Sequence, residues 1–433
     1  MKRILPTVLA ILLTLSLISC TNDMTPAAPK QTTDANTTSA ETPGTTNPPS
    51  DTADTSGSPD TSDIPDDRVL LDYVTTEGMY EVSDRKNVIV FMLDRFDHRY
   101  ADHLIFGKQD HYVKGDYNPT YEPDQEVIDG LSGFTFYENF TGSYARTYPS
   151  VAYLLTGVTS DYSVPYMKSL ENAWSATTFL SDIKQAGYDA RVYSELDFFG
   201  GDTEFLRERI DNIYQSDSDE PYVLNDLEFR KGLLKNGITV DPDSKGTFLF
   251  YHMLGSHNPF LMNAEGEAAT FSDYAEGRYQ QTRGNFKTIF EYIEMLKDKG
   301  VYDKTTIIIT ADHGFTGNYE TISDERVLSL FIKPAGADTD QPLQFSMKQL
   351  CQDNLRASIS SYFGLPCRDG HRTIEDIGEK EELTRIFRWN SYGNGCRDNA
   401  LVIYEIKGDA NKFSNWSIVR REAIDYPYYD PKS

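Results

Sequence analysis

Two apolar runs that each end in an aspartate constrain the fold of this chain more than any other feature. Residues 87–94 read NVIVFMLD, and residues 305–312 read TTIIITAD. A run without polar alternation is typical of a parallel strand that is buried on both faces. A third such run covers 247–252, and a segment with helical periodicity covers 279–299. Strands that alternate with helices predict an α/β fold, with a mostly parallel central sheet and helices on both faces.

The remaining segments fit this pattern and add a small sheet near the C-terminal end. Further helices are predicted at 176–187, 203–214 and 350–363, and further strands at 133–140, 190–194 and 327–332. Two antiparallel strands around a turn are predicted at 401–406 and 416–420. We therefore expect a core domain over 87–365 and a small C-terminal antiparallel subdomain over 366–433.

The first 67 residues predict an export signal and a tether. Two basic residues precede an apolar run at 4–18, and Cys20 follows, as in the signal peptide of a bacterial lipoprotein. Residues 21–67 are acidic and rich in Thr, Pro and Ser, and they lack the apolar residues that a packed core needs. We expect a lipoprotein signal over 1–20, lipidation of Cys20, a disordered tether and a folded domain over 68–433. An uncleaved anchor is the alternative, and both place the domain outside the cytoplasmic membrane of a bacterium.

The charge of the chain argues against a nucleic-acid partner. It has 41 Lys and Arg residues against 67 Asp and Glu residues, a formal net charge of −26. Nucleic-acid binding needs clustered basic residues, so we expect no nucleic acid. An anionic substrate would have to be drawn in locally by a metal ion.

Three cysteines besides Cys20 lie late in the chain, at Cys351, Cys367 and Cys396. In an oxidising compartment we expect one disulfide, between Cys367 and Cys396, which leaves Cys351 as a free, buried thiol. The sequence has no CxxC spacing, so a thiolate zinc site is not expected.

Polar residues at strand ends and at a helix start form the candidate site. Asp94, Asp312 and His313 follow two of the predicted strands, and Thr147 begins a helical stretch after Arg146. The carboxyl ends of parallel strands meet at one edge of a sheet, so these residues are expected to lie together. Carboxylates, an imidazole and a hydroxyl suit Zn²⁺ or Mn²⁺, and the metal would turn the Thr147 hydroxyl into a nucleophile. The start of a helix, with an arginine beside it, favours a phosphate or sulfate group.

Several of these residues also have an ordinary structural interpretation. Thr147 could be a simple helix N-cap with Arg146 as a solvated neighbour, and Asp94 could be a turn residue. His257 follows a Gly-Ser turn and precedes Asn-Pro, which places it to hydrogen-bond a phosphoryl oxygen or to protonate a leaving group. His252 lies inside an apolar strand and is assigned to the core or to a layer behind the metal ligands.

The combination of these motifs resembles the sulfatase and alkaline phosphatase superfamily. Residues 310–314, TADHG, resemble its metal-binding signature, and the strand that ends at Asp94 resembles the strand before its first metal ligand. Residues 146–157 resemble its nucleophile segment. The resemblance covers residues 87–365 in the order of the family. It implies an alkaline-phosphatase-like fold and a metal site formed by Asp94, Thr147, Asp312 and His313.

Within the superfamily the segment is most similar to lipoteichoic acid synthases and phosphoethanolamine transferases. Sulfatases carry Cys or Ser, converted to formylglycine, where this chain has Thr147, and an Arg where it has Val151. Threonine cannot form that aldehyde, so sulfate-ester hydrolysis is disfavoured. The resemblance implies transfer of a phosphoglycerol or phosphoethanolamine group from a phospholipid, through a phosphothreonine, onto an envelope glycan. It also implies one divalent ion, Mn²⁺ or Zn²⁺, with Mg²⁺ or Ca²⁺ as further candidates.

Three other functions stay open. Nucleotide pyrophosphatases and phosphodiesterases also use a threonine followed by an aromatic residue and proline, but their second Asp-x-x-Gly-His ligand set is not found near His257. A phosphodiesterase or phosphatase would share the first half-reaction and use water as the acceptor. A lipoprotein that only binds envelope glycan would keep the fold without the chemistry. In each case we expect the chain to act as a monomer.

Overall fold

The computed structural model describes residues 76–107, 121–194, 206, 209–213, 225–314, 327–391 and 400–426. The chain divides into two units, Met1–Pro65 and Asp66–Ser433, and every described residue belongs to the second unit. The predicted signal peptide, Cys20 and the tether over 21–67 lie outside the described residues. Across the described ranges, none of the helices is both long enough and apolar enough to cross a membrane.

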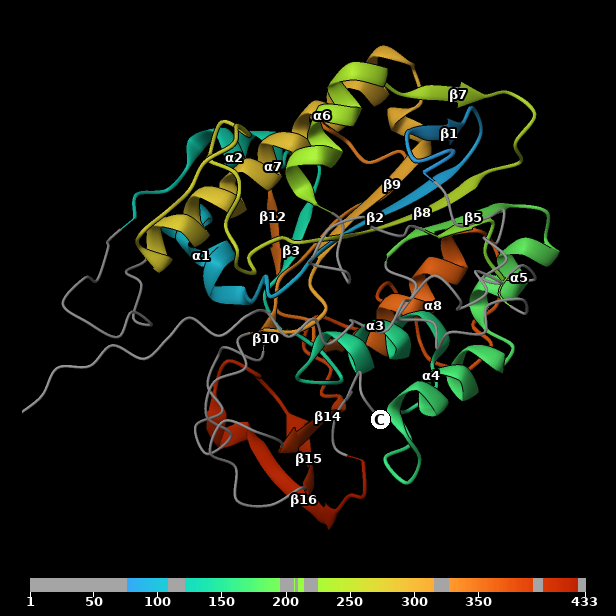
Figure 1. Ribbon diagram of the computed structural model, residues 1–433, viewed down its shortest axis with the longest axis vertical. Coiled ribbons are helices and arrows are strands. Elements are labelled where there is room, and N and C mark those ends of the chain that lie inside the picture. Colours follow the sequence, from blue (N-terminus) through green and yellow to red (C-terminus); the bar gives the residue numbers. More distant parts are fainter. Residues whose placement is uncertain are drawn as a thin grey trace, which may run out of the picture. The chain divides into compact units, whose positions relative to one another are not determined.

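An eight-stranded sheet forms the centre of the second unit (Figure 1). Its strands, in spatial order, are β12 (Gln344–Ser346), β3 (Thr135–Tyr137), β11 (Leu330–Lys333), β9 (Thr305–Thr310), β2 (Asn87–Leu93), β8 (Thr247–Met253), β5 (Asp189–Tyr193) and β6 (Asn212–Ile213). All neighbours from β9 to β6 are parallel, as are β12 and β3, whereas β11 is antiparallel to both of its neighbours. The predicted mostly parallel sheet is confirmed.

The three long apolar runs of the sequence lie side by side at the centre of this sheet. Every residue of β2, β8 and β9 is buried, because each strand has a neighbour on both edges and helices on both faces. Val90 in β2 pairs with Phe250 in β8 and with Ile308 in β9. The register therefore brings the carboxyl ends of all three strands to the same edge.

The helices form two groups on either side of the sheet (Figure 1), as predicted. One group consists of α1 (His98–Phe106), α2 (Gln125–Gly130), α6 (Asp226–Asn236) and α7 (Tyr274–Asp298). The other consists of α3 (Thr147–Thr156), α4 (Tyr166–Ser175), α5 (Phe179–Gln185) and α8 (Gln352–Tyr362). A short 3-10 helix, η4 (Tyr302–Lys304), leads into β9.

Smaller sheets flank this core. The pair β1 (Glu81–Ser83) and β7 (Thr239–Asp241) is parallel, and β4 (Phe140–Thr141) lies between β10 (Val327–Leu328) and β13 (Leu350–Cys351). The C-terminal sheet consists of β14 (Thr384–Ser391), β15 (Ala400–Lys407) and β16 (Trp416–Ala423), with a 3-10 turn, η6 (Phe413–Asn415), before β16. All of its strand pairs are antiparallel, which confirms the predicted small subdomain and adds β14 to it.

The C-terminal sheet contributes most of a second hydrophobic cluster and has an exposed outer strand. Phe387, Trp389, Tyr404 and Trp416 belong to a hydrophobic cluster separate from the main core. Arg385, which is 1% exposed, joins the sheet to the main core because its guanidinium donates to the carbonyl and side-chain oxygens of Asn139 at 2.9 and 2.8 Å.

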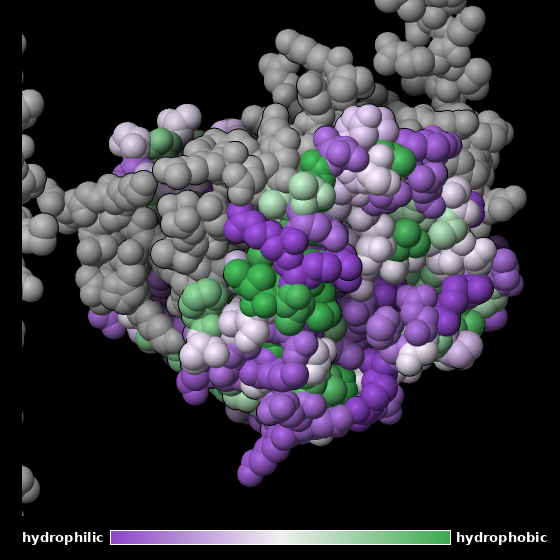
Figure 2. Space-filling view, turned by 90° about the horizontal axis from the view of Figure 1, so that it is seen from below, coloured by the Kyte–Doolittle hydropathy of each residue, from purple (hydrophilic) through white to green (hydrophobic). Residues whose placement is uncertain are grey.

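Seen from below, the surface shows an apolar area framed by hydrophilic residues (Figure 2). Among the exposed apolar residues are Ile418 and Val419 of β16.

Some predicted elements are wrong or have other bounds. A helix was predicted at 203–214, but Asn212–Ile213 at its end form strand β6. These two residues pair with β5, and this tertiary contact overrides the helical periodicity of the sequence. The strand predicted at 133–140 is divided between β3 and β4, which belong to different sheets, and the one at 327–332 between β10 and β11. Helices α1, α2, α4 and α6 were not predicted.

The predicted disulfide between Cys367 and Cys396 cannot be compared with the structure, because Cys396 lies outside the described residues. Cys351 is a free thiol, as predicted.

A close backbone contact fixes the turn after β8 against the end of β2. Gly255 has a φ of +65°, and a β-carbon added there would lie 2.5 Å from the backbone nitrogen of Asp94. An L-residue would therefore meet both a strained backbone and a clash with β2. Gly300 has a similar φ of +67° but open space around it.

These two glycines provide a matched test of the contact. Gly300→Ala should lower the free energy of unfolding by about 1–2 kcal/mol, the cost of a left-handed backbone. Gly255→Ala should lower it by a further ~1–3 kcal/mol, because the added methyl group overpacks the turn. Denaturant unfolding of the two variants measures the difference. Equal losses would contradict the close approach of this turn to Asp94.

Candidate active site

Two buried carboxylates lie where adjacent strands end. Asp94 follows β2 and Asp312 follows β9, and both side chains are fully buried. Oδ1 of Asp312 accepts a hydrogen bond from the backbone N–H of Arg95 at 3.1 Å. Among the described residues, no hydrogen-bond donor reaches either carboxylate oxygen of Asp94 or Oδ2 of Asp312. Buried oxygens without a hydrogen-bond donor lower the stability of the fold, and a bound cation would satisfy them.

The pKa shifts of the two carboxylates also indicate that the site needs a bound cation. Burial raises the pKa of Asp94 well above its usual value, and the neighbouring charge of Asp312 raises it further. Burial also raises the pKa of Asp312. The cation of Arg95 acts in the opposite direction on Asp94 but does not outweigh burial. Two carboxylates in this position are stable as anions only when a further positive charge lies between them.

Two histidines complete the set of possible metal ligands. Nε2 of His313 lies 3.4 Å from Oδ1 of Asp94 and 3.5 Å from Oδ2 of Asp312. His252, in β8, forms a second group with the same carboxylates, in which the three ligand atoms lie within 4.8 Å of one another. Burial lowers the pKa of His252 to about 4, so its imidazole is neutral, the form that binds metals. Carboxylates and neutral imidazoles around one point fit a divalent ion such as Zn²⁺ or Mn²⁺.

Thr147 joins this group from the start of α3. It is the first residue of α3, whereas the N-cap is Arg146, which makes no side-chain capping bond. The interpretation of Thr147 as an ordinary N-cap is therefore wrong, and its hydroxyl is available for other contacts. Its Oγ1 lies 3.0 Å from Nε2 of His313, and its side chain is close enough to Asp312 to lower the pKa of that carboxyl. The start of α3 thus presents a hydroxyl directly to the two carboxylates.

A buried side chain of α8 holds α3 against the end of β9. The hydroxyl of Ser150, one turn after Thr147, donates to the backbone carbonyl of Asp312 at 2.5 Å. Nε2 of Gln352 donates to the Ser150 hydroxyl at 2.8 Å, and its Oε1 accepts from the backbone N–H of Ser143 at 3.0 Å. These bonds fix the distance between the helix and the strand, and hence between Thr147 and Asp312.

The two remaining predicted residues lie beside this group. Arg146 is half-buried at the start of α3. His257 is half-buried in the turn after β8, and its Nδ1 contacts the carbonyl of Asn258. Burial lowers the pKa of His257 to about 4, and the charges of Arg95 and His313 lower it further. His257 is therefore close enough to the group to sense these charges, and it is neutral at neutral pH.

Arg95 was not predicted as part of the site, and His252 lies closer to the carboxylates than its assignment to the core or to a layer behind the ligands suggested. Arg95 is 8% exposed and has a φ of 59°. Its charge lowers the pKa of both Asp94 and His257. Its position next to Asp94 was the only signal in the sequence. His252 was assigned to the core or to a layer behind the ligands, whereas the structure groups it with both carboxylates. The register of β8 beside β2, which pairs His252 with Met92, brings it there.

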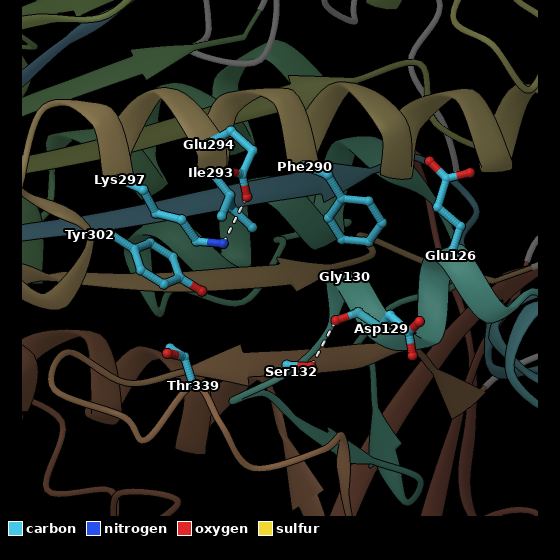
Figure 3. Close-up of a pocket in the computed structure, with 10 residues that line it drawn as sticks. All are labelled: Glu126, Asp129, Gly130, Ser132, Phe290, Ile293, Glu294, Lys297, Tyr302 and Thr339. Carbon is cyan, nitrogen blue, oxygen red and sulfur yellow. Dashed lines mark hydrogen bonds and ion pairs between the residues drawn. The ribbon is translucent and has the colours of Figure 1, made fainter.

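A separate pocket of about 650 Å³ lies away from these residues (Figure 3). Phe290 and Tyr302 face into it, from α7 and η4, and Ser132 and Thr339 lie across from them. The lysine at its end, Lys297, pairs with Glu294 at 2.7 Å. None of the residues discussed above lines this pocket, so it is not part of the candidate active site.

The chain is similar in sequence to a known enzyme of the bacterial cell envelope. Lipoteichoic acid synthase from Staphylococcus aureus (strain USA300) is 25% identical over 272 residues, which is 59% of this chain and 40% of the synthase. The chain thus matches less than half of the length of that relative. The solved structure of the lipoteichoic acid synthase LtaP from Listeria monocytogenes matches with a TM-score of 0.48 and 13% identity, over 80% of this chain and 86% of that chain.

A further solved structure matches at the same level. The C-terminal periplasmic domain of EcEptC from Escherichia coli, in complex with Zn, has a TM-score of 0.48 and 14% identity, over 76% of this chain and 96% of that chain. The family model described as Sulfatase matches residues 106–342, more than half of the chain. The resemblance inferred from the motifs is confirmed: this chain belongs to the sulfatase family.

Proposed function

We propose that this protein is a metal-dependent phosphotransferase of the cell envelope. It would move a phosphoglycerol or phosphoethanolamine type group from a phospholipid donor onto an envelope glycan. The observation that carries the proposal is the position of Thr147, whose hydroxyl is not used as a helix cap and lies 3.0 Å from Nε2 of His313. Similarity to lipoteichoic acid synthases supports the same class of reaction.

The first half-reaction would form a phosphothreonine. Oγ1 of Thr147 attacks the phosphorus of the donor, a new O–P bond forms, and the bond from phosphorus to the leaving alcohol breaks. The hydroxyl proton of Thr147 ends on that alcohol, which is a diacylglycerol when the donor is a phospholipid. In the second half-reaction a glycan hydroxyl attacks the phosphorus and its proton returns to the threonine oxygen.

The surrounding residues have separate tasks in this scheme. Asp94, Asp312 and His313 would hold one divalent ion together with Thr147, and His252 is a further candidate ligand. When bound, the ion would polarise the phosphoryl oxygens and the Thr147 hydroxyl. Mn²⁺ and Zn²⁺ suit this mixture of ligands, and Mg²⁺ and Ca²⁺ remain candidates.

Binding of the phosphoryl group falls to residues around the start of α3. Arg146 and the first backbone N–H groups of the helix would bind the phosphate oxygens. His257 would carry the proton of the Thr147 hydroxyl to the leaving alcohol, with Nε2 as the atom that accepts and releases it, because Nδ1 faces the carbonyl of Asn258. The pKa of about 4 keeps the imidazole neutral, which is the form that can accept this proton.

Water in place of the glycan would make the same site a phosphodiesterase or phosphatase. The first half-reaction and all residues named above are shared, so only the acceptor separates the two. Sulfate-ester hydrolysis is a weaker candidate, because Thr147 occupies the position of the formylglycine precursor. A protein that only binds envelope glycan has no need for the buried carboxylates, whose burial is costly.

A lipid on Cys20 and a tether over 21–67 would keep the domain near its donor. We propose that the domain faces the outside of the bacterial cytoplasmic membrane, where phospholipid headgroups and envelope glycans are both within reach. We expect the protein to be a monomer and to bind no nucleic acid.

One divalent ion per chain is expected in the purified protein. Asp312→Asn should abolish binding and Asp94→Asn should weaken it strongly, because each removes a negative ligand from a site with few. Asp97→Asn is the matched control, since Asp97 is equally buried but is paired with Arg99 at 2.6 Å. Metal analysis of the four proteins decides the matter. Full occupancy in Asp312→Asn would refute the assignment, and two ions per chain would favour the pyrophosphatase and phosphodiesterase type of site.

Thr147 should carry the transferred group during the reaction. Incubation with phosphatidylglycerol or phosphatidylethanolamine should add the mass of the headgroup phosphate to the peptide that contains Thr147. Thr147→Ala should lose both the adduct and turnover. His257→Ala should keep its metal but react about 10²- to 10⁴-fold more slowly, the usual effect of losing a positioned acid or base. Wild-type turnover by Thr147→Ala on these donors would exclude the phosphothreonine route.

A further inference from the structure

The turn after β8, which carries His257, is held at its beginning by one buried carboxylate. Asp226, the first residue of α6, is 1% exposed. Its Oδ1 accepts the backbone N–H of Leu254 at 2.8 Å, and its Oδ2 accepts that of Gly255 at 2.9 Å. Both amides lie immediately before Ser256 and His257. The carboxylate therefore fixes the backbone at the point where the chain leaves the sheet.

The end of the same segment is held by a buried amide of α7. Oε1 of Gln281 accepts the backbone N–H groups of Leu261 and Met262 at 2.8 and 2.9 Å. Its Nε2 donates to Oδ2 of Asp226 at 2.9 Å, and Gln281 is fully buried. The Asp226–Gln281 pair thus ties the two ends of residues 254–262 to each other, with His257 between them.

The same segment contacts the backbone of a candidate metal ligand. The N–H of Ser256 donates to the carbonyl of Asp94 at 2.9 Å, and the N–H of Asp94 donates to the carbonyl of Met253 at 3.1 Å. Helix α7 adds a hydrogen bond from Asn285 to the carbonyl of Gly255 at 3.0 Å. A shift of the segment would therefore displace Asp94 as well as His257.

Burial makes the charged form of Asp226 costly in the folded protein. Burial raises the pKa of Asp226 to about 7, although the N–H groups of Leu254 and Gly255 favour the charged form. Because the folded-state pKa lies above the value of an exposed aspartate, the proton is held more tightly in the folded state, and stability falls as pH rises towards 7. Residues that lower stability in this way are common where a site must be held in one geometry.

We propose that Asp226 and Gln281 are positioning residues that hold the His257 segment, and through it Asp94, in the geometry needed for phosphoryl transfer. The expected fall in kcat rests on the proposed function. The expected loosening of the backbone of residues 254–262 does not. Neither residue touches the substrate. Each acts through the backbone of residues 254–262.

Asp226→Asn is the most sensitive variant, because it keeps the shape and replaces one acceptor oxygen by an NH₂ group. That group would face a backbone N–H or the amide of Gln281, so at least one hydrogen bond is lost. We expect kcat to fall about 10- to 100-fold, the effect of a small misplacement of a catalytic group, with KM changed far less. Metal content should fall far less than in Asp94→Asn, because every candidate ligand is kept and only its position changes. Gln281→Leu should produce the same change, and the two together should be no worse than either alone.

Gln280→Leu is the matched control for Gln281→Leu. Gln280 is the neighbouring glutamine of α7, and its Oε1 also accepts a backbone N–H, that of Ala264 at 2.9 Å, beyond the His257 segment. Loss of a hydrogen bond in general would affect both variants, whereas loss of positioning affects only Gln281→Leu. Equal kcat values for Gln280→Leu and Gln281→Leu would overturn the proposal.

Amide hydrogen exchange tests the same inference without any enzymatic assay. In Asp226→Asn and Gln281→Leu, the amides of Leu254, Gly255, Leu261 and Met262 should exchange at least ~10-fold faster, while those of β2 and β9 keep their protection. Wild-type protection of the four amides in both variants would refute the positioning role. A wild-type protein without phosphotransferase activity would refute the proposed function, and the exchange result would still decide the structural claim.

Discussion

The burial of two carboxylates beside each other is the constraint on which the rest of this structure depends. Parallel pairing of β2 with β9 brings Asp94 and Asp312 to one edge of the sheet, where both lie out of contact with water. Burial raises the pKa of each, and the charge of Asp312 raises the pKa of Asp94 further. A divalent ion would supply the missing charge and would also satisfy oxygens that the described protein groups leave without donors.

Buried hydrogen bonds fix the neighbouring segments to this edge. On one side, Ser150 and Gln352 hold α3 against the carbonyl of Asp312, so the hydroxyl of Thr147 keeps its distance from the carboxylates. On the other side, Asp226 and Gln281 hold the segment that carries His257. The candidate nucleophile and the candidate acid are thus held by the core of the domain, as the proposed transfer would require.

The sequence was most informative where local pattern decides structure. Uninterrupted apolar runs identified β2, β8 and β9, and the acids that follow them identified Asp94 and Asp312, because ends of parallel strands necessarily meet. Other residues depend on contacts that no local pattern records. His252 reaches the site through the register of β8, and Gln352 meets Ser150 from 202 positions away. The same limit explains β6, where pairing with β5 prevailed over helical periodicity.

The proposed site requires a cation bound between Asp94 and Asp312. The most direct test is anomalous X-ray diffraction from crystals of the Mn²⁺- or Zn²⁺-loaded protein, which locates the ion independently of activity. We expect one strong anomalous peak within about 2.0–2.3 Å of a carboxylate oxygen of each aspartate and of an imidazole nitrogen, His313 or His252. A fully loaded crystal whose only peaks lie elsewhere, with the two carboxylates bonded to each other through a shared proton, would contradict the account.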